Sequence, residues 1–355
     1  MISATDIKSQ ARSLGFDLVG IAPAASLPEL TRLNEWLARG YAGEMTYLTK
    51  SAKAREDIRN VLPSARSVIV TGTVYYTDDR TNQQQRHIAR YAWGEDYHIV
   101  LAKRLEALVA WMRAASGADF DAFAFVDKHH VQERVFARHA GLGWIGKNTC
   151  LISPEVGSWL FLAGVAVSLD LPPDTPGVDQ CGSCTQCIDA CPTGAIVDAY
   201  ELDATRCISY LTIELHGPIP EDQRAAIGDH VFGCDICQEV CPWNLAPLAT
   251  LDPVWQPHPE RASLDPASLW RRSDFELHSL VQGSAMTRTS ISRLRRNLAT
   301  VLGNSSDELA PRVLDEPGHG VPAAARSAEL PLVREHVEWA KDRLTGTEGR
   351  ARPRG

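Results

Sequence analysis

Several features are scarce in this 355-residue chain, and each scarcity excludes a class of protein. The longest apolar runs, such as Trp159–Val167, are too short to span a bilayer, and Met1–Ser13 has no basic stretch followed by an apolar core. We therefore expect no membrane association and a cytoplasmic location. Positive charge is not in excess either, because the net charge is -8, which argues against a protein wrapped wholly in nucleic acid. Any nucleic-acid partner should contact a restricted face.

Cysteine is too sparse for a small protein stapled by disulfides, since nine cysteines are spread over 355 residues. An odd count in a reducing compartment instead points to metal binding or catalysis. Eight of the nine lie between Cys181 and Cys241, and the ninth is Cys150. This clustering favours metal binding.

The chain does have enough apolar residues, 44%, to bury a substantial core, and its length suggests two or three domains. Helical and strand patterns alternate over the first half, which predicts an α/β domain. The predicted helices are Ser3–Leu14, Leu27–Arg39 and one that contains Ile99–Met112, and the predicted strands are Phe16–Ala22, Ser67–Tyr76, Phe120–Val126 and Trp159–Leu169.

Proline and glycine mark the end of this domain. Leu171–Gly177 holds three prolines and one glycine, a composition typical of linkers and turns. The cysteine-rich segment follows, and helical periodicity returns beyond it at Arg288–Leu302. We therefore predict an α/β domain over residues 1–172, a ferredoxin-like two-cluster domain over 173–250 and a helical domain over 251–355, with a frayed end at 346–355.

Two cysteine runs carry the most specific signal in the sequence. The first, from Cys181 to Cys191-Pro192, reads C-x2-C-x2-C-x3-C-P, the pattern of bacterial ferredoxins, whose fourth cysteine binds a second cluster. The second run, from Cys234 to Cys241-Pro242, keeps C-x2-C-x3-C-P but lacks the leading cysteine, which Cys207 can supply. The predicted ligands are Cys181, Cys184, Cys187 and Cys241 for one 4Fe-4S cluster and Cys191, Cys207, Cys234 and Cys237 for the other.

Zinc sites and disulfides are the alternatives to this interpretation. Zinc prefers two C-x2-C pairs separated by a longer loop and does not require the repeated C-x3-C-P ending. Disulfides are disfavoured in a reducing compartment. Two neighbouring clusters pass single electrons, so we expect the rest of the chain to hold their acceptor.

Four sequence blocks extend beyond the cysteine pattern. They are Tyr91–His98 (YAWGEDYH), Ala140–Asn148 (AGLGWIGKN), Arg206–Glu214 (RCISYLTIE) and the pair FGCDIC and CPWN within Phe232–Asn244. Together they resemble the epoxyqueuosine reductase family over most of residues 1–250. The resemblance implies a cobalamin-binding α/β domain and two 4Fe-4S clusters that together reduce epoxyqueuosine to queuosine at the wobble position of tRNA. It also implies an electron donor such as a flavodoxin or ferredoxin system.

The resemblance assigns roles to individual residues. It implies that Asp127, directly after the predicted strand Phe120–Val126, is the proton donor, whereas the alternative is a helix N-cap for Val131 onward. Lys128-His129-His130 departs from the small residues and proline usual in the family, and these side chains could alter the donor's protonation. The implied cobalamin contacts are Arg55, Tyr97, Asp127, Lys147, Asn148 and Ser209. For these contacts, surface, packing, turn or helix-start roles are the alternatives.

One histidine bears on whether the protein ligates the cobalt ion of cobalamin. The cobalt-ligating pattern D-x-H-x-x-G is half present at Asp96-Tyr97-His98, but Leu101 stands where glycine is required. We infer that no histidine ligates cobalt from below.

The C-terminal segment Arg295–Asn304 resembles a helix of the HEAT-like domain that the family uses on tRNA. Arg293, Arg295 and Arg296 concentrate positive charge there in an acidic protein, so we expect them to contact tRNA phosphates. The alternative is a solvated helix face.

Two other functions of the whole protein remain as alternatives. One is a corrinoid reductive dehalogenase, which usually has an export signal with paired arginines that Met1–Ser13 lacks. The other is a non-catalytic ferredoxin-type electron carrier.

Overall fold

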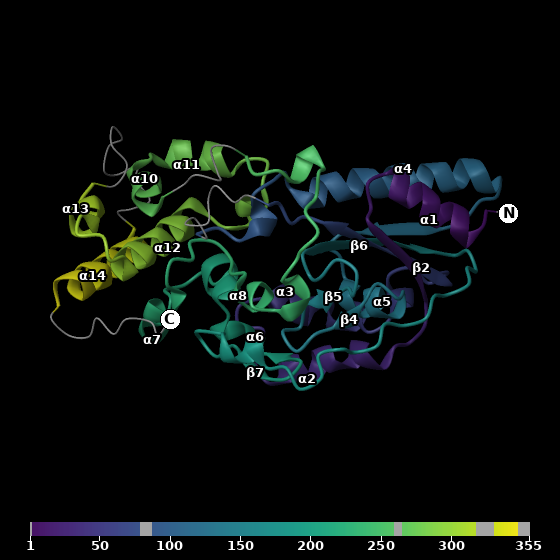
Figure 1. The fold of residues 1–355 in the computed structure, drawn as a ribbon, viewed down its shortest axis with the longest axis horizontal. Coiled ribbons are helices and arrows are strands. Elements are labelled where there is room, and N and C mark those ends of the chain that lie inside the picture. Colours follow the sequence, from purple (N-terminus) through teal and green to yellow (C-terminus); the bar gives the residue numbers. More distant parts are fainter. Residues whose placement is uncertain (1, 79–86, 259–264, 317–329, 347–355) are drawn as a thin grey trace. The chain divides into compact units, whose positions relative to one another are not determined.

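The structure, a computed structural model, describes residues 2–78, 87–258, 265–316 and 330–346 (Figure 1). The chain forms two compact units. The first comprises Met1–Asp78, Gly94–Thr205 and Asp235–Gln256, and the second comprises Asp79–Trp93, Arg206–Cys234 and Pro257–Gly355. The units interleave along the sequence, whereas the three predicted domains are consecutive, and that division remains a prediction. The predicted frayed end lies, from residue 347 onward, outside the described residues.

A four-stranded sheet forms the centre of the first unit. Its strand order is β1-β2-β6-β3, and every neighbouring pair is antiparallel. The strands are β1 (Leu18–Pro23), β2 (Ser67–Val74), β6 (Leu160–Val167) and β3 (Ala122–Phe125). All four fall within the predicted strands to within one residue. Gly164 of β6 has no side chain where a Cβ would lie 2.6 Å from the ring of Phe125, so the two strands can pack closely.

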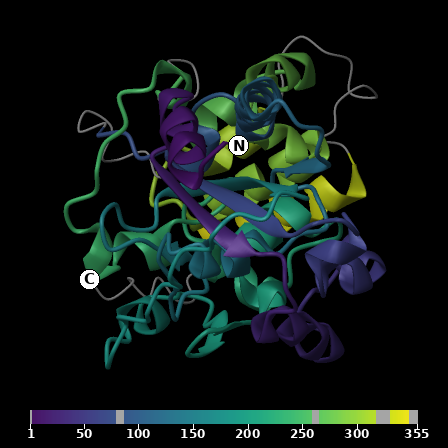
Figure 2. The ribbon, with the colours of Figure 1, turned by 90° about the vertical axis from the view of Figure 1, so that its right-hand side faces the viewer.

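Helices cover both faces of this sheet, which explains why all eight residues of β2 are buried. Helix α1 (Ala4–Ser13) contacts β1 and α4 (Tyr97–Ser116), and α4 contacts β3 and β6. Figures 1 and 2 show α1 and α4 together on one side of the strands. Helix α5 (Glu133–His139) packs on the other face, where its buried side chains join a core with those of β1, β2, β3 and β6. The mixed α/β architecture that the sequence predicted is confirmed.

A local signal accounts for the start of the first helix, whereas the second predicted helix differs in the structure. The predicted capping box forms at the start of α1, where the hydroxyl of Ser3 accepts the backbone N–H of Asp6 at 3.1 Å. The single helix predicted over Leu27–Arg39 is instead a 3-10 turn followed by a short helix.

The further elements of this unit are η1 (Pro28–Thr31), α2 (Arg32–Ala38), α3 (Thr46–Arg55), η2 (Ile58–Asn60), β4 (Trp144–Ile145), β5 (Leu151–Ile152), α6 (Gln186–Asp189), β7 (Ile196–Asp198), β8 (Glu201–Leu202), α8 (Ile236–Glu239), η8 (Pro242–Asn244) and η9 (Pro253–Trp255).

The second unit is helical around α12 (Ile291–Asn304), which contacts α10, α11, α13 and α14. Ten consecutive residues of α12, from Leu294 to Gly303, are buried, so neighbours surround this helix. The other elements are η4 (Arg90–Ala92), η6 (Tyr210–Glu214), α7 (Glu221–Arg224), η7 (Ala225–Ile227), α10 (Pro266–Arg271), α11 (Asp274–Val281), η10 (Ala285–Arg288), α13 (Ala310–Leu314) and α14 (Pro331–Thr345), while η5 (Ala204–Arg206) lies at the junction of the units. Among the helices of the described residues, none combines the length and apolarity needed to span a membrane.

Candidate active site and iron-sulfur ligands

Asp127 follows β3 in a backbone conformation that few residues other than glycine adopt. The strand ends at Phe125, and Asp127 has a φ of 44°, in the left-handed region. Helix α5 begins at Glu133 with Gln132 at its N-cap position, so Asp127 does not cap this helix. A carboxylate held in a strained conformation at the end of a strand motivates a functional role.

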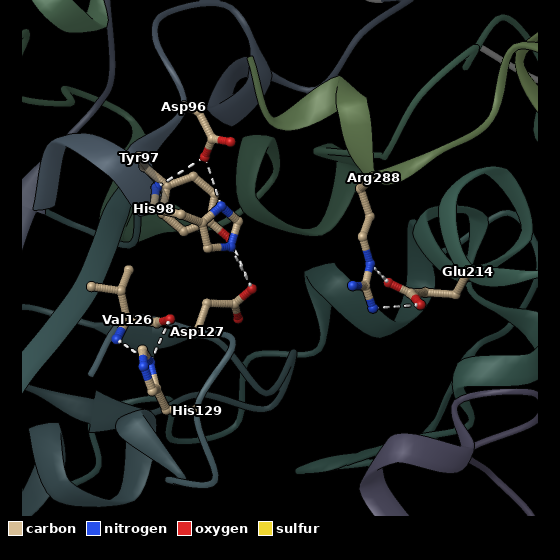
Figure 3. Close-up of polar contacts among 8 residues, drawn as sticks. All are labelled: Asp96, Tyr97, His98, Val126, Asp127, His129, Glu214 and Arg288. Carbon is tan, nitrogen blue, oxygen red and sulfur yellow. Dashed lines mark hydrogen bonds and ion pairs between the residues drawn. The ribbon is translucent and has the colours of Figure 1, made fainter. Parts of the chain in front are cut away.

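Two residues at the start of α4 hold the Asp127 carboxylate (Figure 3). The hydroxyl of Tyr97 donates to its Oδ2 at 3.0 Å, and Nε2 of His98 lies 3.1 Å from the same oxygen. The other ring nitrogen of His98, Nδ1, lies 2.7 Å from Oδ1 of Asp96, the N-cap residue of α4. The ring of Tyr97 stacks on His98 and on Phe161, with centroid distances of 4.0 and 4.5 Å. The structure thus brings together Asp127 and Tyr97, two of the residues predicted from the sequence.

The charges of this group favour a carboxylate next to an imidazolium. Partial desolvation of the carboxylate tends to raise the pKa of Asp127, but the hydrogen bonds and positive charge of His98, with smaller effects from Tyr97 and Arg134, outweigh it and lower the pKa. Burial tends to lower the pKa of His98, but the carboxylates of Asp127 and Asp96 prevail and raise it. The side chain of Asp127 is 62% exposed and that of His98 15%. The pair is therefore open to a ligand on the carboxylate side.

His129 does not influence Asp127 in the way that the sequence suggested. Its Nδ1 accepts the backbone N–H of Val126 at 3.1 Å, and its ring packs edge-on against Phe123 (Figure 3). The histidine that lowers the pKa of Asp127 is instead His98. The sequence contained one signal for it, the Asp96-Tyr97-His98 triplet, which we considered only as a possible cobalt-ligand motif.

Glu133, the first residue of α5, is a second carboxyl group that interacts with Asp127. Its Oε1 is buried without a hydrogen-bond partner, and burial together with the negative charge of Asp127 raises its pKa to about 8. The positive charge of Arg55 opposes this rise. Arg55 is itself buried and donates to the hydroxyl of Ser51 at 2.9 Å and to the carbonyl of Val131 at 2.8 Å. Sequence reasoning missed Glu133, because nothing in the one-dimensional pattern shows that a carboxyl oxygen of this glutamate at a helix start is buried.

The four thiols predicted to bind the first cluster line one cavity of the first unit. Its volume is about 180 Å³, and its lining residues are Cys181, Cys184, Cys187, Cys241, Lys147, Asn148, Ile152, Gln180, Pro242 and Trp243. Burial and the neighbouring thiols of Cys241 and Cys181 raise the pKa of Cys187 to about 11, so these groups are close enough to interact. Four cysteine donors around one cavity fit a 4Fe-4S cluster. Within the described ranges, no three His, Cys, Asp or Glu side chains are grouped to hold a single metal ion such as zinc.

Lys147 and Asn148 bind the loops that carry these cysteines. The ammonium group of Lys147 donates to the carbonyls of Gly182 and Cys184 at 2.7 and 2.9 Å. The amide of Asn148 donates to the carbonyl of Cys237 at 3.2 Å. These contacts give both residues a place beside the iron-sulfur ligands, while their predicted contact with cobalamin remains a prediction.

Trp144, on strand β4, contacts two of the residues that line this cavity. The indole is buried, packs edge-on against Trp243 and donates its N–H to the sulfur of Cys181 at 3.4 Å. Hydrogen bonds to cluster sulfurs tune reduction potentials, so this contact would tune the potential of a cluster that Cys181 binds. The sequence did not reveal it, since Trp144 lies 37 positions from Cys181.

The remaining cysteines are divided between the units. Cys191 and Cys237 belong to the first unit, and Cys207 and Cys234 to the second, so the second ligand set remains a prediction. Cys150, which has no predicted ligand role, hydrogen-bonds with Cys237, and this bond lowers the pKa of the Cys150 thiol to about 7. Ser209 precedes the π-helical turn η6 in the second unit, where its side chain makes no capping hydrogen bond.

The predicted phosphate contacts of Arg295 and Arg296 are wrong, because both side chains are fully buried in the second unit. Arg295 donates to Oδ1 of Asp274 at 2.7 Å and to the carbonyl of Trp270 at 2.9 Å. Arg296 donates to several backbone carbonyls, among them that of Leu211 at 2.6 Å. The arginines that looked like a basic surface therefore hold the helices together.

Arg293 and Arg288 differ from this buried pair. Arg293 donates to the carbonyl of Ile213 at 2.9 Å and is half-buried, so part of it still reaches solvent. Arg288 is 47% exposed and forms a bidentate ion pair with Glu214 at 2.9 and 3.0 Å (Figure 3). The expected contact of Arg293 with tRNA remains a prediction.

Comparison with known families defines the class of this protein. A sequence profile described as a 4Fe-4S double cluster binding domain matches residues 180–244, which contain both Cys-Pro runs. The match and the thiol-lined cavity identify an iron-sulfur protein with two 4Fe-4S clusters. A second profile, described as epoxyqueuosine reductase QueG, DUF1730, matches residues 55–128, the segment that contains Tyr97, His98 and Asp127.

Relatives that align along nearly the whole chain give the family. The epoxyqueuosine reductase of Xanthomonas campestris pv. campestris is 40% identical, over 95% of each chain. That of Gloeobacter violaceus is 44% identical, over 87% of this chain and 98% of its own. The chain belongs to the epoxyqueuosine reductase family, and it is an oxidoreductase.

Solved structures agree with this result. A crystal structure of an epoxyqueuosine reductase with an epoxyqueuosine-modified tRNA-Tyr stem loop is 32% identical, with a TM-score of 0.84 over 96% of this chain and 89% of that one. A Bacillus subtilis epoxyqueuosine reductase whose catalytic aspartate loop is swung out of the active site is 30% identical, with a TM-score of 0.83 over 96% of this chain and 90% of that one.

Proposed function

We propose that this protein reduces epoxyqueuosine to queuosine at the wobble position of tRNA. The observation that carries the proposal is the Asp127 group, an open carboxylate held by His98 and Tyr97 in the same unit as the thiol-lined cavity. Full-length relatives named epoxyqueuosine reductase, one of them seen with a modified tRNA stem loop, supply the substrate class. The reaction consumes two electrons and two protons, and the epoxide oxygen leaves as water.

Asp127 is the proton donor in this proposal. A carboxyl group at the open end of the site can give a proton to the epoxide oxygen as its bond to carbon breaks. Tyr97 orients the carboxylate through its hydroxyl, and the stack of Tyr97 on Phe161 fixes the ring that carries this hydroxyl. General acid catalysis of this kind contributes roughly a hundredfold or more to the rate.

The two 4Fe-4S clusters supply the electrons, one at a time, and the proposed acceptor is cobalamin. When bound, cobalamin supplies a cobalt centre that takes up these electrons and reduces the epoxide. Both ring nitrogens of His98 face carboxylates, at 2.7 and 3.1 Å, which supports the inference that this histidine does not bind cobalt. The residues proposed to contact cobalamin are Arg55, Tyr97, Asp127, Lys147, Asn148 and Ser209.

The partners follow from the same reaction. The substrate is tRNA bearing epoxyqueuosine, and the electron donor is a flavodoxin or ferredoxin system. We assign the helical elements of the second unit to a HEAT-like domain that contacts tRNA, with Arg293 as a phosphate contact. A corrinoid dehalogenase or a simple electron carrier is not favoured, because the relatives named epoxyqueuosine reductase align along nearly the whole chain.

An omission experiment tests the cofactor assignment. The reconstituted protein is incubated anaerobically with a chemical reductant and tRNA that contains epoxyqueuosine, either with or without cobalamin, and the nucleosides are analysed. We expect queuosine only in the complete mixture. Equal conversion without cobalamin would refute the cobalamin assignment, and conversion by protein stripped of iron would refute the electron route.

A further inference from the structure

We propose that His98 is a positioning residue that stores the proton used by Asp127, within a relay that runs from Asp96 through His98 to Asp127. The proposal deepens the proposed function and rests on Asp127 acting as the proton donor. The residues that it adds to the site, His98 and Asp96, are not among the proposed cobalamin contacts or cluster ligands.

The geometry of the relay comes from one helix start and one loop (Figure 3). Asp96 occupies the N-cap of α4 and accepts two hydrogen bonds from His98, one from the backbone N–H at 3.0 Å and one from Nδ1 at 2.7 Å. These two bonds fix the position and the rotation of the imidazole. Nε2 then points to Oδ2 of Asp127, 3.1 Å away. Because Nδ1 keeps its proton in the hydrogen bond to Asp96, the proton that the imidazolium can release is the one on Nε2.

The surroundings favour one shared proton on the pair of His98 and Asp127. The two carboxylates raise the pKa of His98 despite its burial, and His98 lowers the pKa of Asp127. Asp127 alone would therefore be an ionised carboxylate near neutral pH, a state that cannot donate a proton. The imidazolium next to it holds the proton that is needed.

Other charged groups face the relay from each neighbouring element. Lys128, on the Asp127 loop, favours the charged form of Asp96. Arg134, on α5, favours the carboxylate of Asp127, and the Asp127 carboxylate in turn raises the pKa of Glu133. Glu133 also holds a proton near neutral pH, because its pKa is raised to about 8, but its Oε1 makes no hydrogen bond. Nε2 of His98 lies 3.1 Å from the Asp127 carboxylate, and this geometry makes His98 the proton carrier of the relay.

The transfer itself moves one proton and no electrons. The N–H bond at Nε2 of His98 breaks and an O–H bond forms at Oδ2 of Asp127, which leaves a neutral imidazole whose Nδ1–H remains bound to Asp96. Asp127 then gives its proton to the epoxide oxygen, while the two electrons arrive through the cofactors. Solvent restores the proton through the carboxylate of Asp127, whose side chain is 62% exposed.

The first test measures the protonation of His98 itself and needs no turnover. In protein with labelled histidine and oxidised clusters, nuclear magnetic resonance should show His98 titrating above the usual value of about 6.5. Asp127→Asn and Asp96→Asn should each lower that pKa, because each removes a negative charge from one ring nitrogen. A His98 pKa that neither substitution moves would overturn the relay.

The second test is a single-turnover pH profile of His98→Gln, with His130→Gln as a matched control at an exposed histidine of the same loop as Asp127. The wild-type rate should fall as the pH rises through the pKa of His98. His98→Gln should lose about tenfold or more at neutral pH, together with this pH dependence, while His130→Gln keeps both. A folded His98→Gln protein with the wild-type rate and profile would contradict the proposal. Absence of queuosine from the wild type would instead refute the proposed function, and the titration of His98 would still decide the relay.

Discussion

Nε2 of His98 lies 3.1 Å from Oδ2 of Asp127, although 29 positions separate the two residues in sequence. The contact joins the first turn of α4 to the loop after β3, two segments that the sheet brings together. Because the same histidine is held by Asp96 on its other nitrogen, the protonation of Asp127 depends on a side chain outside its own loop.

Glu133→Gln tests the burial of a second carboxyl at this site. The pKa of Glu133 rises to about 8 in the folded protein from an ordinary value of 4.5. A group with a raised pKa stabilises the fold fully below its unfolded value, and that stability is lost as the pH rises toward about 8. Glutamine stays neutral, so the thermal midpoint of Glu133→Gln should exceed that of the wild type by an amount that grows between pH 5 and pH 8. A difference that is constant over this range would show that Glu133 is ionised when folded.

The iron content tests the ligand assignment. Two 4Fe-4S sites predict about eight iron atoms per chain after anaerobic reconstitution. Cys241→Ser removes one of the four thiols around the cavity and should lower the iron content by about half. Cys150→Ser is the matched control at the cysteine without a predicted ligand role, and it should leave the iron content unchanged. Loss of a cluster in Cys150→Ser, with none in Cys207→Ser, would reverse the assignment of these two cysteines.

Trp144→Phe tests the hydrogen bond to the sulfur of Cys181. Phenylalanine keeps a smaller aromatic ring at this buried position but deletes the indole N–H, a donor that stabilises the more negative, reduced cluster. A hydrogen bond of about 1 kcal/mol corresponds to a one-electron potential change of roughly 40 mV, so the midpoint potential should fall by about that amount. A redox titration followed by electron paramagnetic resonance measures it. An unchanged potential in a fully loaded variant would show that this bond does not tune the cluster.

Arg295 and Arg293 should respond differently to substitution. Arg295→Ala leaves the half-buried carboxylate of Asp274 and the carbonyl of Trp270 without their donor and should destabilise the second unit by about 3 kcal/mol. Arg293→Ala loses the hydrogen bond to the carbonyl of Ile213 and should lower the thermal midpoint less than Arg295→Ala does. It should also weaken tRNA binding, with a shallower dependence of affinity on salt. Thermal unfolding and tRNA binding at several salt concentrations measure the two effects. Unchanged tRNA affinity in Arg293→Ala would place the phosphate contacts elsewhere.

The sequence predicted the features that depend on local spacing. The cysteine runs, the capping box of Ser3 and Asp6 and the four strands all follow from patterns within a few residues, and the structure or the family match confirms them. The contacts that determine the roles of His98, Trp144 and Arg295 are tertiary. Charge spacing alone could not distinguish an exposed arginine from Arg295, because its acceptors, including the carbonyl of Trp270, lie more than twenty positions away.

Conversion of epoxyqueuosine in a single turnover by wild-type protein and by Asp127→Asn tests the central claim most directly. Both proteins are loaded with iron and cobalamin, reduced anaerobically and mixed with tRNA that contains epoxyqueuosine, and the nucleosides are quantified over time. The asparagine retains the size of the side chain but cannot donate an acidic proton. We predict that the wild type forms queuosine and that Asp127→Asn retains both cofactors but reacts about a hundredfold more slowly, or slower still. Failure of the loaded wild-type protein to form queuosine would contradict the proposed function, and a near-normal rate in Asp127→Asn would contradict the role of Asp127 as proton donor.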